Sequence, residues 1–521
     1  MNKLKRILGF GITLGIGALA LAGCSDNKTT TKKDNTTKPV VTTKPNVTTK
    51  EDDTKEYEKG LSNKDYNFEQ EFFFDDYNAR SLADTNRQGV ETFSDKDIIF
   101  DAITYEELVN ILESNGKYLF FFGGSWCHNT RAAAPYVNSI AKEYGVTKIF
   151  NFDFYLDGTN GSTHVRNTNP TDPARVTAGT EYNFLYGELV TKYLTNLNDF
   201  VEYKTDTASA LKFNDKEGTE TTVAKLQVPF LFYYDKNNTE GPIVSAFEEM
   251  VDLDSNGIYK GKKADGSRNY ITDQYVDGLH DFFDSIKKSD GSVEVTNYSD
   301  KDYIINTYNT RSGKEIFASN SQINIESITY RQLDWLLNQE GNSIILLGGT
   351  WCGNTQASIK TFNDYAVEND LIIYNFDTKL DSGIAKSKLG YSKDAHIRES
   401  NTKLTTLYTD LIDKYFTNIV TLYDVNDEAS YKHIEYTNKE GEVVKVKKLQ
   451  VPYLLSYNKD AKDSDDLIAP ITSYYEEMLS LNETAPSYVY SETNYKSIKD
   501  NTFNIIKTYA DRTGLNTKNI D

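Results

Sequence analysis

The feature that most constrains the fold is an internal repeat, because two stretches of the chain match each other piece by piece. Their cysteines, Cys127 and Cys352, lie 225 positions apart. The matched pieces are Gly123–Thr130 with Gly348–Thr355, Phe152–Asp153 with Phe376–Asp377, His164–Arg166 with His396–Arg398, Leu185–Tyr186 with Leu407–Tyr408, Leu226–Pro229 with Leu449–Pro452, and Glu248–Met250 with Glu476–Met478. Self-similarity in a fixed order indicates a duplication. The chain therefore contains two copies of one domain.

The N-terminus indicates export. Lys3, Lys5 and Arg6 precede an apolar stretch, Ile7–Leu21, and the sequence Leu21-Ala22-Gly23-Cys24 follows. This pattern resembles the lipobox of bacterial lipoproteins. The resemblance implies cleavage after residue 23, a lipid such as palmitate on Cys24, and a location at the extracytoplasmic face of the cell membrane. An uncleaved anchor and an ordinary secretory signal are the alternatives.

The next segment, residues 24–60, is rich in Thr, Lys and Pro and lacks the apolar residues of a core. We expect a disordered linker there, then one domain over 61–295 and a second over 296–521.

Acidic residues exceed basic ones by 77 to 57, giving a net charge of −20, which argues against a nucleic-acid partner. Three cysteines and five histidines, without a CxxC or HxxxH cluster, predict neither a metal site nor a cofactor.

Each copy reads as an α/β domain with a sheet flanked by helices. Continuous apolar runs predict strands buried on both faces, and helical spacing follows the first cysteine over 132–144. A further strand is expected over 148–154, and a helix ends each copy, over 275–287 and 495–509. The predicted buried strands are Tyr118–Phe122, Phe230–Tyr234, Ser343–Leu347 and Tyr453–Tyr457.

This order of elements, with Trp-Cys after a strand and Val-Pro about a hundred residues later, resembles the thioredoxin superfamily. The resemblance implies two tandem thioredoxin-like domains, each a mixed sheet flanked by helices, with a helical insertion before the proline. It implies cis peptide bonds at Pro229 and Pro452, which face the sulfur. Pro135 matches the proline that kinks the helix in that family. The residues expected to dock an extended substrate are Trp126, Trp351, Val228, Pro229, Val451 and Pro452.

Two departures from the family pattern bear on the chemistry. Thr130 and Thr355 stand where the family has its second cysteine, so neither domain can close an internal disulfide. Phe121 and Leu346 replace the family's buried acid. Each copy keeps one thiol at a helix start, where free N–H groups favour a thiolate. We expect Cys127 and Cys352 to be the attacking thiols, with the hydroxyls of Thr130 and Thr355 hydrogen-bonded to them.

The histidines are weaker candidates. His164 and His396 recur in a His-aliphatic-Arg pattern, and each is a proton donor near the sulfur or a structural hydrogen-bonding residue. Pro135 and His128 have no counterparts in the second copy, so Cys352 is predicted to be the less reactive thiol.

The run that begins at Asp252 starts like a calcium loop, but Lys263 stands where the bidentate Glu belongs.

Three functional hypotheses follow. The favoured one is thiol–disulfide exchange on exported proteins or peptides through single thiols. The second is a non-catalytic surface module that holds a peptide or protein partner in the same groove. The third is a disulfide between Cys127 and Cys352 across the domain interface, which requires the two Cα atoms to lie within about 7 Å.

Overall fold

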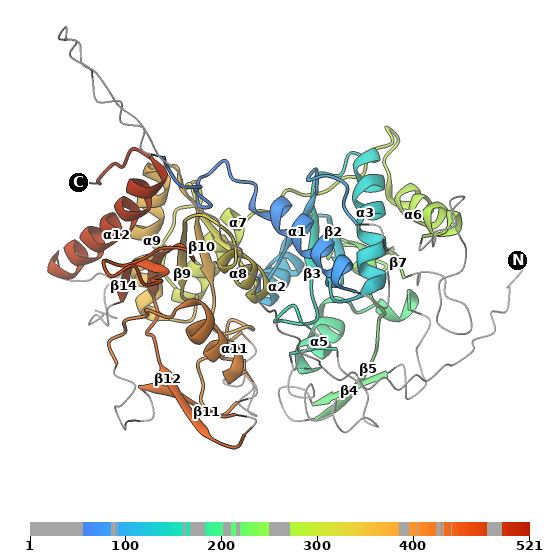
Figure 1. Cartoon of the computed structure of the whole chain (residues 1–521). Coiled ribbons are helices and arrows are strands. Elements are labelled where there is room, and N and C mark those ends of the chain that lie inside the picture. Colours follow the sequence, from blue (N-terminus) through green and yellow to red (C-terminus); the bar gives the residue numbers. More distant parts are fainter. Residues whose placement is uncertain are drawn as a thin grey trace, which may run out of the picture.

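The computed structural model shows two α/β units side by side, each built around one five-stranded mixed sheet (Figure 1). Cys24, the linker up to residue 55 and the segment from Asp252 to Lys263 lie outside the described residues. Within the described part, no helix is long and apolar enough to cross a membrane. The described residues are 56–84, 90, 92–159, 163–166, 183–201, 210–214, 219–248, 271–384, 395–402, 404–423, 429, 432–438, 440–476 and 492–520.

The first sheet has the strand order β1-β3-β2-β6-β7. Strands β1, β3 and β2 are parallel, whereas β6 runs antiparallel to β2, and β7 antiparallel to β6. The strands are β1 (Phe100–Ala102), β2 (Tyr118–Phe122), β3 (Ile149–Phe152), β6 (Phe230–Tyr234) and β7 (Ile243–Phe247). The second sheet repeats this order with β8 (Ile325–Ser327), β10 (Ile373–Phe376), β9 (Ser343–Leu347), β13 (Tyr453–Tyr457) and β14 (Ile471–Glu476).

The central strands have the predicted bounds because their side chains are buried on both faces. Every residue of β2, β6, β9 and β13 is buried. In the first sheet this core is aromatic, and the Phe120 and Phe232 rings stack with centroids 5.0 Å apart. Two five-stranded mixed sheets in this order are consistent with two tandem thioredoxin-like domains.

Helices cover both sheets. In the first unit they are α1 (Phe68–Ala83), α2 (Tyr105–Glu113), α3 (His128–Glu143) and α6 (Asp273–Ile286), and in the second α7 (Asp300–Ser312), α8 (Tyr330–Leu337), α9 (Gly353–Glu368) and α12 (Glu492–Thr513). Both α2 and α8 begin with a capping box, in which two residues each accept a hydrogen bond from the other's backbone N–H. The pair is Thr104 and Glu107 in α2, and Thr329 and Gln332 in α8. The start of α2 and α8 is thus fixed by local sequence.

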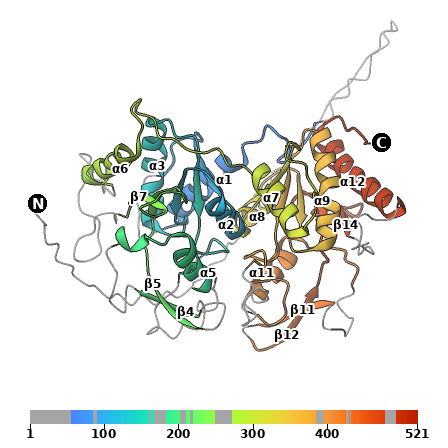
Figure 2. The same ribbon diagram turned by 180° about the vertical axis from the view of Figure 1, so that it is seen from behind.

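The insertion before the proline strand contains a hairpin that the sequence analysis did not predict. Its helical part is α5 (Asn183–Glu188) and η1 (Leu189–Tyr193) in the first unit, and α11 (Thr405–Asp410) and η3 (Leu411–Tyr415) in the second; η2 (Leu197–Asp199) is a short 3₁₀ turn. The hairpins are β4 (Ala210–Asn214) with β5 (Glu220–Ala224), and β11 (His433–Thr437) with β12 (Val443–Lys447). Both insertions project from the same side of the molecule (Figure 2).

The leading segment of each unit packs on the other unit. Leu61 N–H donates to Asn342 O at 2.7 Å, and Ile344 N–H to Ser62 Oγ at 2.8 Å, so the start of the predicted first domain lies on the second sheet. Conversely, Thr296 N–H donates to Lys117 O at 2.8 Å. Helix α1 then packs on both units, since it contacts β1 and α3 as well as α8. The two units share one continuous core.

Candidate functional site

Each cysteine lies at the junction of a buried strand and a long helix. Cys127 is the N-cap residue of α3, and Cys352 that of α9; both helices are 16 residues long. Both thiols are free and partly exposed, so the Cys127–Cys352 disulfide is not formed. Neither cysteine side chain forms a cap hydrogen bond, but the N-cap position places each residue at the positive end of the helix dipole.

The proline loop faces each sulfur. The Val228–Pro229 and Val451–Pro452 peptide bonds are cis, as the family resemblance implies. Cys127 Sγ lies 3.8 Å from Val228 O, and Cys352 Sγ lies 3.3 Å from Val451 O. The structure therefore brings cysteine and proline loop together in both units across about a hundred residues of sequence.

The threonines do not act as predicted. Thr130 and Thr355 are completely buried, and neither hydroxyl oxygen has a hydrogen-bond partner, so the expected bond to the sulfur is absent. The Thr130 side chain is instead turned toward the end of β2, where a Cβ on Gly123 would lie 2.7 Å from its hydroxyl oxygen. The Thr130 side chain thus packs against the backbone of Gly123, at the end of β2.

The first unit's tryptophan is held by a partly buried aspartate that sequence reasoning did not single out. Trp126 Nε1 donates to Asp153 Oδ1 at 2.7 Å, and the same oxygen accepts from Tyr155 N at 2.9 Å. Burial raises the pKa of Asp153 to about 7, with the hydrogen bond from Trp126 acting in the opposite direction. The His164 ring packs against Tyr155 with centroids 4.1 Å apart, and its Nδ1 accepts from Arg166 N at 2.9 Å.

The second unit repeats this arrangement with one exchange. Trp351 Nε1 donates to Asp377 Oδ1 at 2.8 Å, and burial raises the pKa of Asp377 to about 6. Lys379 takes the place of the tyrosine, with Nζ 4.2 Å from the centroid of the Trp351 ring. Both aspartates belong to the Phe-Asp pair that the two repeats share, so the comparison of the repeats could have identified them as site residues.

His396 is buried and in hydrogen-bond contact with its neighbours. Its Nδ1 lies 3.0 Å from Thr378 O, and its Nε2 lies 3.4 Å from a guanidinium nitrogen of Arg398. Burial and the nearby Arg398 charge hold the pKa of His396 well below its ordinary range. These contacts tie the ring to its neighbours, and the proton-donor role of His396 stays a prediction. The proton-donor role of His164 stays a prediction.

Three side chains anchor the proline loop of the first unit. Arg166 donates to Leu226 O, and Glu248 accepts from Gln227 N. The Tyr186 hydroxyl accepts from Leu226 N at 2.9 Å. These residues come from repeat motifs that lie far apart in the sequence, which explains why those motifs recur.

The second unit uses the equivalent residues. Arg398 donates to Leu449 O, the Tyr408 hydroxyl accepts from Leu449 N at 2.9 Å, and Glu476 accepts from Gln450 N at 2.5 Å. The repeated His-aliphatic-Arg motif thus matters for its arginine, whereas the sequence analysis drew attention to its histidine.

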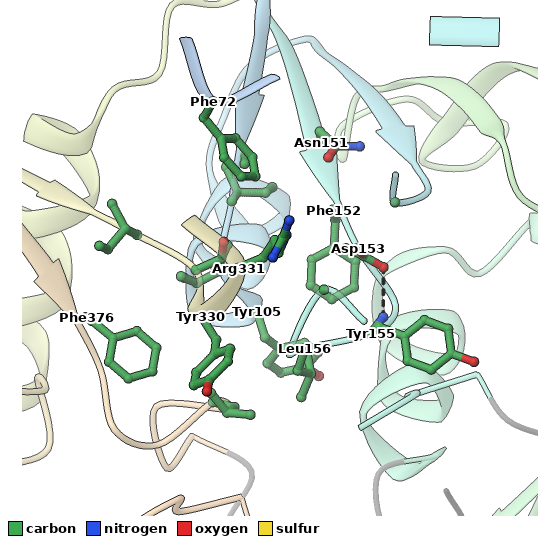
Figure 3. Close-up of a pocket in the computed structure, with 18 of the residues that line it drawn as sticks. Phe72, Tyr105, Asn151, Phe152, Asp153, Tyr155, Leu156, Tyr330, Arg331 and Phe376 are labelled. Carbon is green, nitrogen blue, oxygen red and sulfur yellow. Dashed lines mark hydrogen bonds between the residues drawn. The ribbon is translucent and has the colours of Figure 1, made fainter. Parts of the chain in front are cut away.

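A cavity of about 60 Å³ lies between the two units and is walled by both. Its lining includes Asp153 and Asp377, the partners of the two tryptophans, together with Tyr155, Tyr330 and Phe376 (Figure 3). The two aspartates that hold the tryptophans therefore border one shared space.

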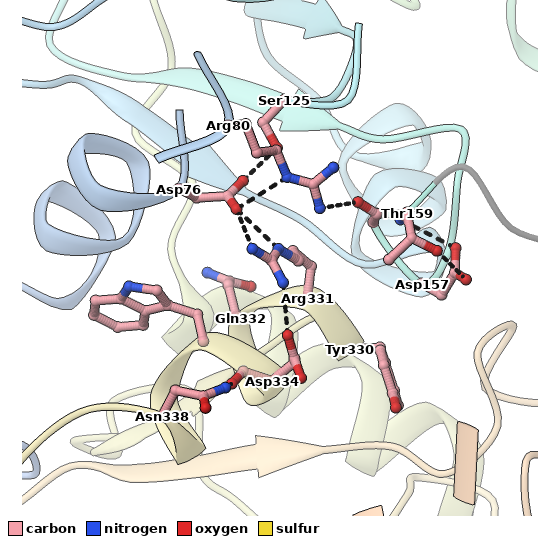
Figure 4. A network of polar contacts seen from close by, with 12 residues as sticks. Asp76, Arg80, Ser125, Asp157, Thr159, Tyr330, Arg331, Gln332, Asp334 and Asn338 are labelled. Carbon is pink, nitrogen blue, oxygen red and sulfur yellow. Dashed lines mark hydrogen bonds and ion pairs between the residues drawn. The ribbon is translucent and has the colours of Figure 1, made fainter. Parts of the chain in front are cut away.

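A polar network closes the same interface. Asp76 of α1 accepts from Ser125 and Arg80 of the first unit and from Arg331 of the second (Figure 4). Arg331 also donates to Asp334 at 2.6 Å. Since Ser125 lies two residues before Cys127, this network ties the turn that carries the thiol to the partner unit.

No family model and no curated protein matches the chain. Among solved structures, two crystal forms of ERdj5 are similar. Form I has 8% identity and a TM-score of 0.18, covering 79% of this chain and 29% of that chain; form II has 9% identity and a TM-score of 0.14, covering 68% and 27%. The chain thus spans under a third of their length. The strand order, rather than these similarities, supports the thioredoxin-like fold.

Proposed function

We propose that this chain is a lipid-anchored, extracytoplasmic thioredoxin-like protein that carries out thiol–disulfide exchange on exported proteins through Cys127 and Cys352. The observation that carries the proposal is the placement of the thiols. In both units a free, partly exposed cysteine begins a long helix and faces the carbonyl that precedes a cis-proline. Helix starts favour the thiolate, which is the attacking species.

The exchange proceeds in two balanced steps. The cysteine thiolate attacks one sulfur of a substrate disulfide, forming a mixed disulfide and releasing the other substrate sulfur as a thiolate. A second thiolate of the same substrate then attacks the substrate sulfur of the mixed disulfide. This step releases the cysteine thiolate and forms a new substrate disulfide. No net oxidation occurs, so disulfides are rearranged, and no second cysteine within the domain is needed.

The exposed surface beside each sulfur is suited to an extended peptide. Trp126 and Trp351 are partly exposed and pack against the core beside the cysteines. Val228 and Val451 are buried, and a tyrosine hydroxyl anchors the backbone two residues before each of them, so the loop backbone is preorganised. We assign these residues to substrate docking.

The test is rearrangement of a protein with mispaired disulfides by the full chain in detergent. Wild type should speed the rearrangement, and a Cys127→Ser, Cys352→Ser double variant should reduce it to the background rate. A mixed disulfide between substrate and one cysteine should be found by mass spectrometry. Cys24→Ser is the matched control: exchange in detergent should persist, while attachment to membranes and lipid labelling are lost.

A wild-type rate equal to that of the double variant would overturn the exchange proposal. If the double variant then still bound an extended peptide from the substrate, the non-catalytic groove would be the function. If the Cys24→Ser variant still incorporated the lipid label, the proposed lipid anchor on Cys24 would be wrong. The exchange proposal would be unaffected by that result.

A further inference from the structure

One residue of each unit reaches across the interface toward the turn that carries the other unit's cysteine. Glu106 is the second residue of α2, and Arg331 is the second residue of α8. They occupy the same place in the repeat, since each follows Ile-Thr-Tyr. The two copies thus carry opposite charges at one matched position of the repeat.

Glu106 binds the cysteine turn of the second unit directly. The Thr350 hydroxyl donates to its carboxylate and lies 3.1 Å from Oε2 and 3.2 Å from Oε1. Two residues of α7 complete the contact: the Tyr303 hydroxyl donates to Oε2 at 2.8 Å, and Arg311 Nε lies 3.9 Å from Oε1. Glu106 is 2% exposed and Thr350 is 3% exposed, so the bond between them is shielded from water. The first unit therefore supplies the acceptor for a hydroxyl two residues before Cys352.

Arg331 reaches the cysteine turn of the first unit through Asp76. Arg331 Nε donates to Asp76 Oδ1 at 2.9 Å, and Oδ2 of Asp76 accepts from the Ser125 hydroxyl. Ser125 stands two residues before Cys127, which is the place of Thr350 in the other copy. Both turns are therefore held at the same residue, by a carboxylate that joins the two units.

The held hydroxyl belongs to the turn that sets the position of the sulfur. Cys352 N–H donates to Gly349 O at 3.0 Å, and Cys352 Sγ lies 3.3 Å from Val451 O. The Thr350 carbonyl accepts from Gln356 Nε2 at 2.6 Å, so the turn is bonded to its own helix as well as to the other unit. Releasing the hydroxyl loosens the turn and, with it, the contact of the thiol with the proline loop.

We propose that Glu106 and Arg331 are positioning residues through which each unit controls the thiol of the other. Glu106 holds the turn of Cys352 at the proline loop, and Arg331 holds the turn of Cys127 there through Asp76. A thiol held at a carbonyl is less available for attack, so loss of either contact makes the thiol of the opposite unit more reactive. This assignment deepens the proposed function and rests on it for its purpose. Thiol reactivity itself is measured without any exchange.

The experiment measures the rates at which iodoacetamide alkylates Cys127 and Cys352 at pH 7, in the full folded chain, with the modified peptides separated by mass. Glu106→Ala should speed alkylation of Cys352 by roughly threefold to tenfold, the factor that one lost hydrogen bond is worth. Cys127 in the same molecule is the internal control and should keep its wild-type rate.

Arg331→Met should show the reverse pattern, with Cys127 alkylated faster and Cys352 at its wild-type rate. Its effect should be the smaller of the two, because Arg80 still binds Asp76. If Arg331→Met changed Cys352 as much as Cys127, the crossed assignment would be wrong.

Conservative variants separate this role from packing. Glu106→Gln keeps an oxygen for the Thr350 hydroxyl, and Thr350→Ser keeps the hydroxyl, so both should leave Cys352 near its wild-type rate. Thr350→Val should match Glu106→Ala, and the two changes together should add nothing, because they break the same bond. If Glu106→Ala does not fold, Thr350→Val carries the test.

Asn110→Ala is the matched control within the interface. Asn110 lies on α2 one turn after Glu106, and its Nδ2 donates to Thr307 Oγ1 of α7 at 3.0 Å. The variant loosens the same pair of helices without touching the turn of Cys352, whose alkylation rate should stay at the wild-type value. An equal rise of Cys352 in Asn110→Ala, a rise of both cysteines in Glu106→Ala, or no rise in Thr350→Val would overturn the assignment.

The two proposals fail separately. A crossed alkylation pattern without disulfide rearrangement would keep this assignment and remove the exchange function. Rearrangement by a chain whose alkylation rates ignore Glu106 and Arg331 would remove the assignment and keep the exchange.

Discussion

At the scale of single residues, the two thiols differ although their surroundings are repeated. Cys352 Sγ lies 3.3 Å from its carbonyl acceptor, closer than the 3.8 Å of Cys127. Arg131, one turn after Cys127, donates to Ser125 O, whereas Gln356 takes that place in the second unit. The shorter contact holds the Cys352 S–H group more firmly at its carbonyl, so this thiol is less available for attack. The Arg131 charge is already paired with Asp84.

We therefore predict that Cys352 is alkylated more slowly than Cys127 at pH 7, by about three- to tenfold. Peptide-resolved alkylation of the full chain measures both rates in one sample. Equal rates in wild type would contradict the prediction.

Asp153 makes folding depend on pH. Its pKa is raised from an ordinary 3.8 to about 7, so the folded protein binds the proton more tightly than the unfolded chain between these values. The free energy of unfolding should therefore fall as pH rises from about 4 to 7. Asp153→Asn, which keeps an acceptor for Trp126, should weaken this dependence and raise stability at pH 8 by at most about 4 kcal/mol. Denaturation at several pH values measures it.

The exposed Asp465 provides the control for that experiment. Asp465→Asn should leave the pH dependence of unfolding as it is in wild type. An Asp153→Asn variant with the wild-type pH dependence would show that this carboxyl does not titrate upon unfolding.

At the scale of elements, the strands that are buried on both faces could be predicted from the sequence, because burial requires a continuous apolar run. Strands β2, β6, β9 and β13 are apolar throughout and were predicted residue for residue. The hairpin strand β12 has the sequence Val-Val-Lys-Val-Lys and buries only one of its five residues, so no continuous apolar run marks it. The insertion was consequently predicted as helical, and its hairpins were missed.

The anchoring of the proline loop gives a prediction at this scale. The Tyr408 hydroxyl donates to Lys447 O at 2.7 Å and accepts from Leu449 N at 2.9 Å. Tyr408→Phe leaves both backbone groups without this partner and should lower the free energy of unfolding by about 1–3 kcal/mol. Tyr474→Phe, at a residue 39% exposed, is the control and should change stability by less than about 0.5 kcal/mol. Chemical denaturation compares the two.

At the scale of the whole molecule, the two units form one folding unit through exchanged segments. Residues 60–62 pair with the second sheet before α1 crosses to the first, and Phe68 of α1 packs on Trp335 with centroids 5.4 Å apart. The segment before α7 packs on the first unit in return. Separate domains joined by a linker would lack such shared packing.

The Asp76 network should hold the units together. Arg331→Met removes one of the two cations that pair with Asp76, a carboxylate 3% exposed, and should destabilise the interface by about 1–3 kcal/mol, since Arg80 remains. Thermal unfolding should then separate into two transitions, and protease should cut between the units at a lower temperature than in wild type. Lys360→Met, which breaks the exposed pair with Asp364, is the control and should leave a single transition. A single, unshifted transition in Arg331→Met would contradict the prediction.

The sequence by itself determined the duplication, the buried strands and the position of each cysteine at a helix start. These features depend on local periodicity and on the comparison of the chain with itself. The cis-prolines followed from the family resemblance, and the structure shows both.

Only the tertiary structure decided which repeated residues meet at the sulfur. It buried Thr130 and Thr355 away from the sulfur and placed Arg166 and Arg398 at the proline loop. It also packed the first unit's leading segment on the second sheet. The physical reason is that burial and charge pairing depend on residues far apart in the sequence, and local pattern carries no information about which distant backbone a side chain reaches.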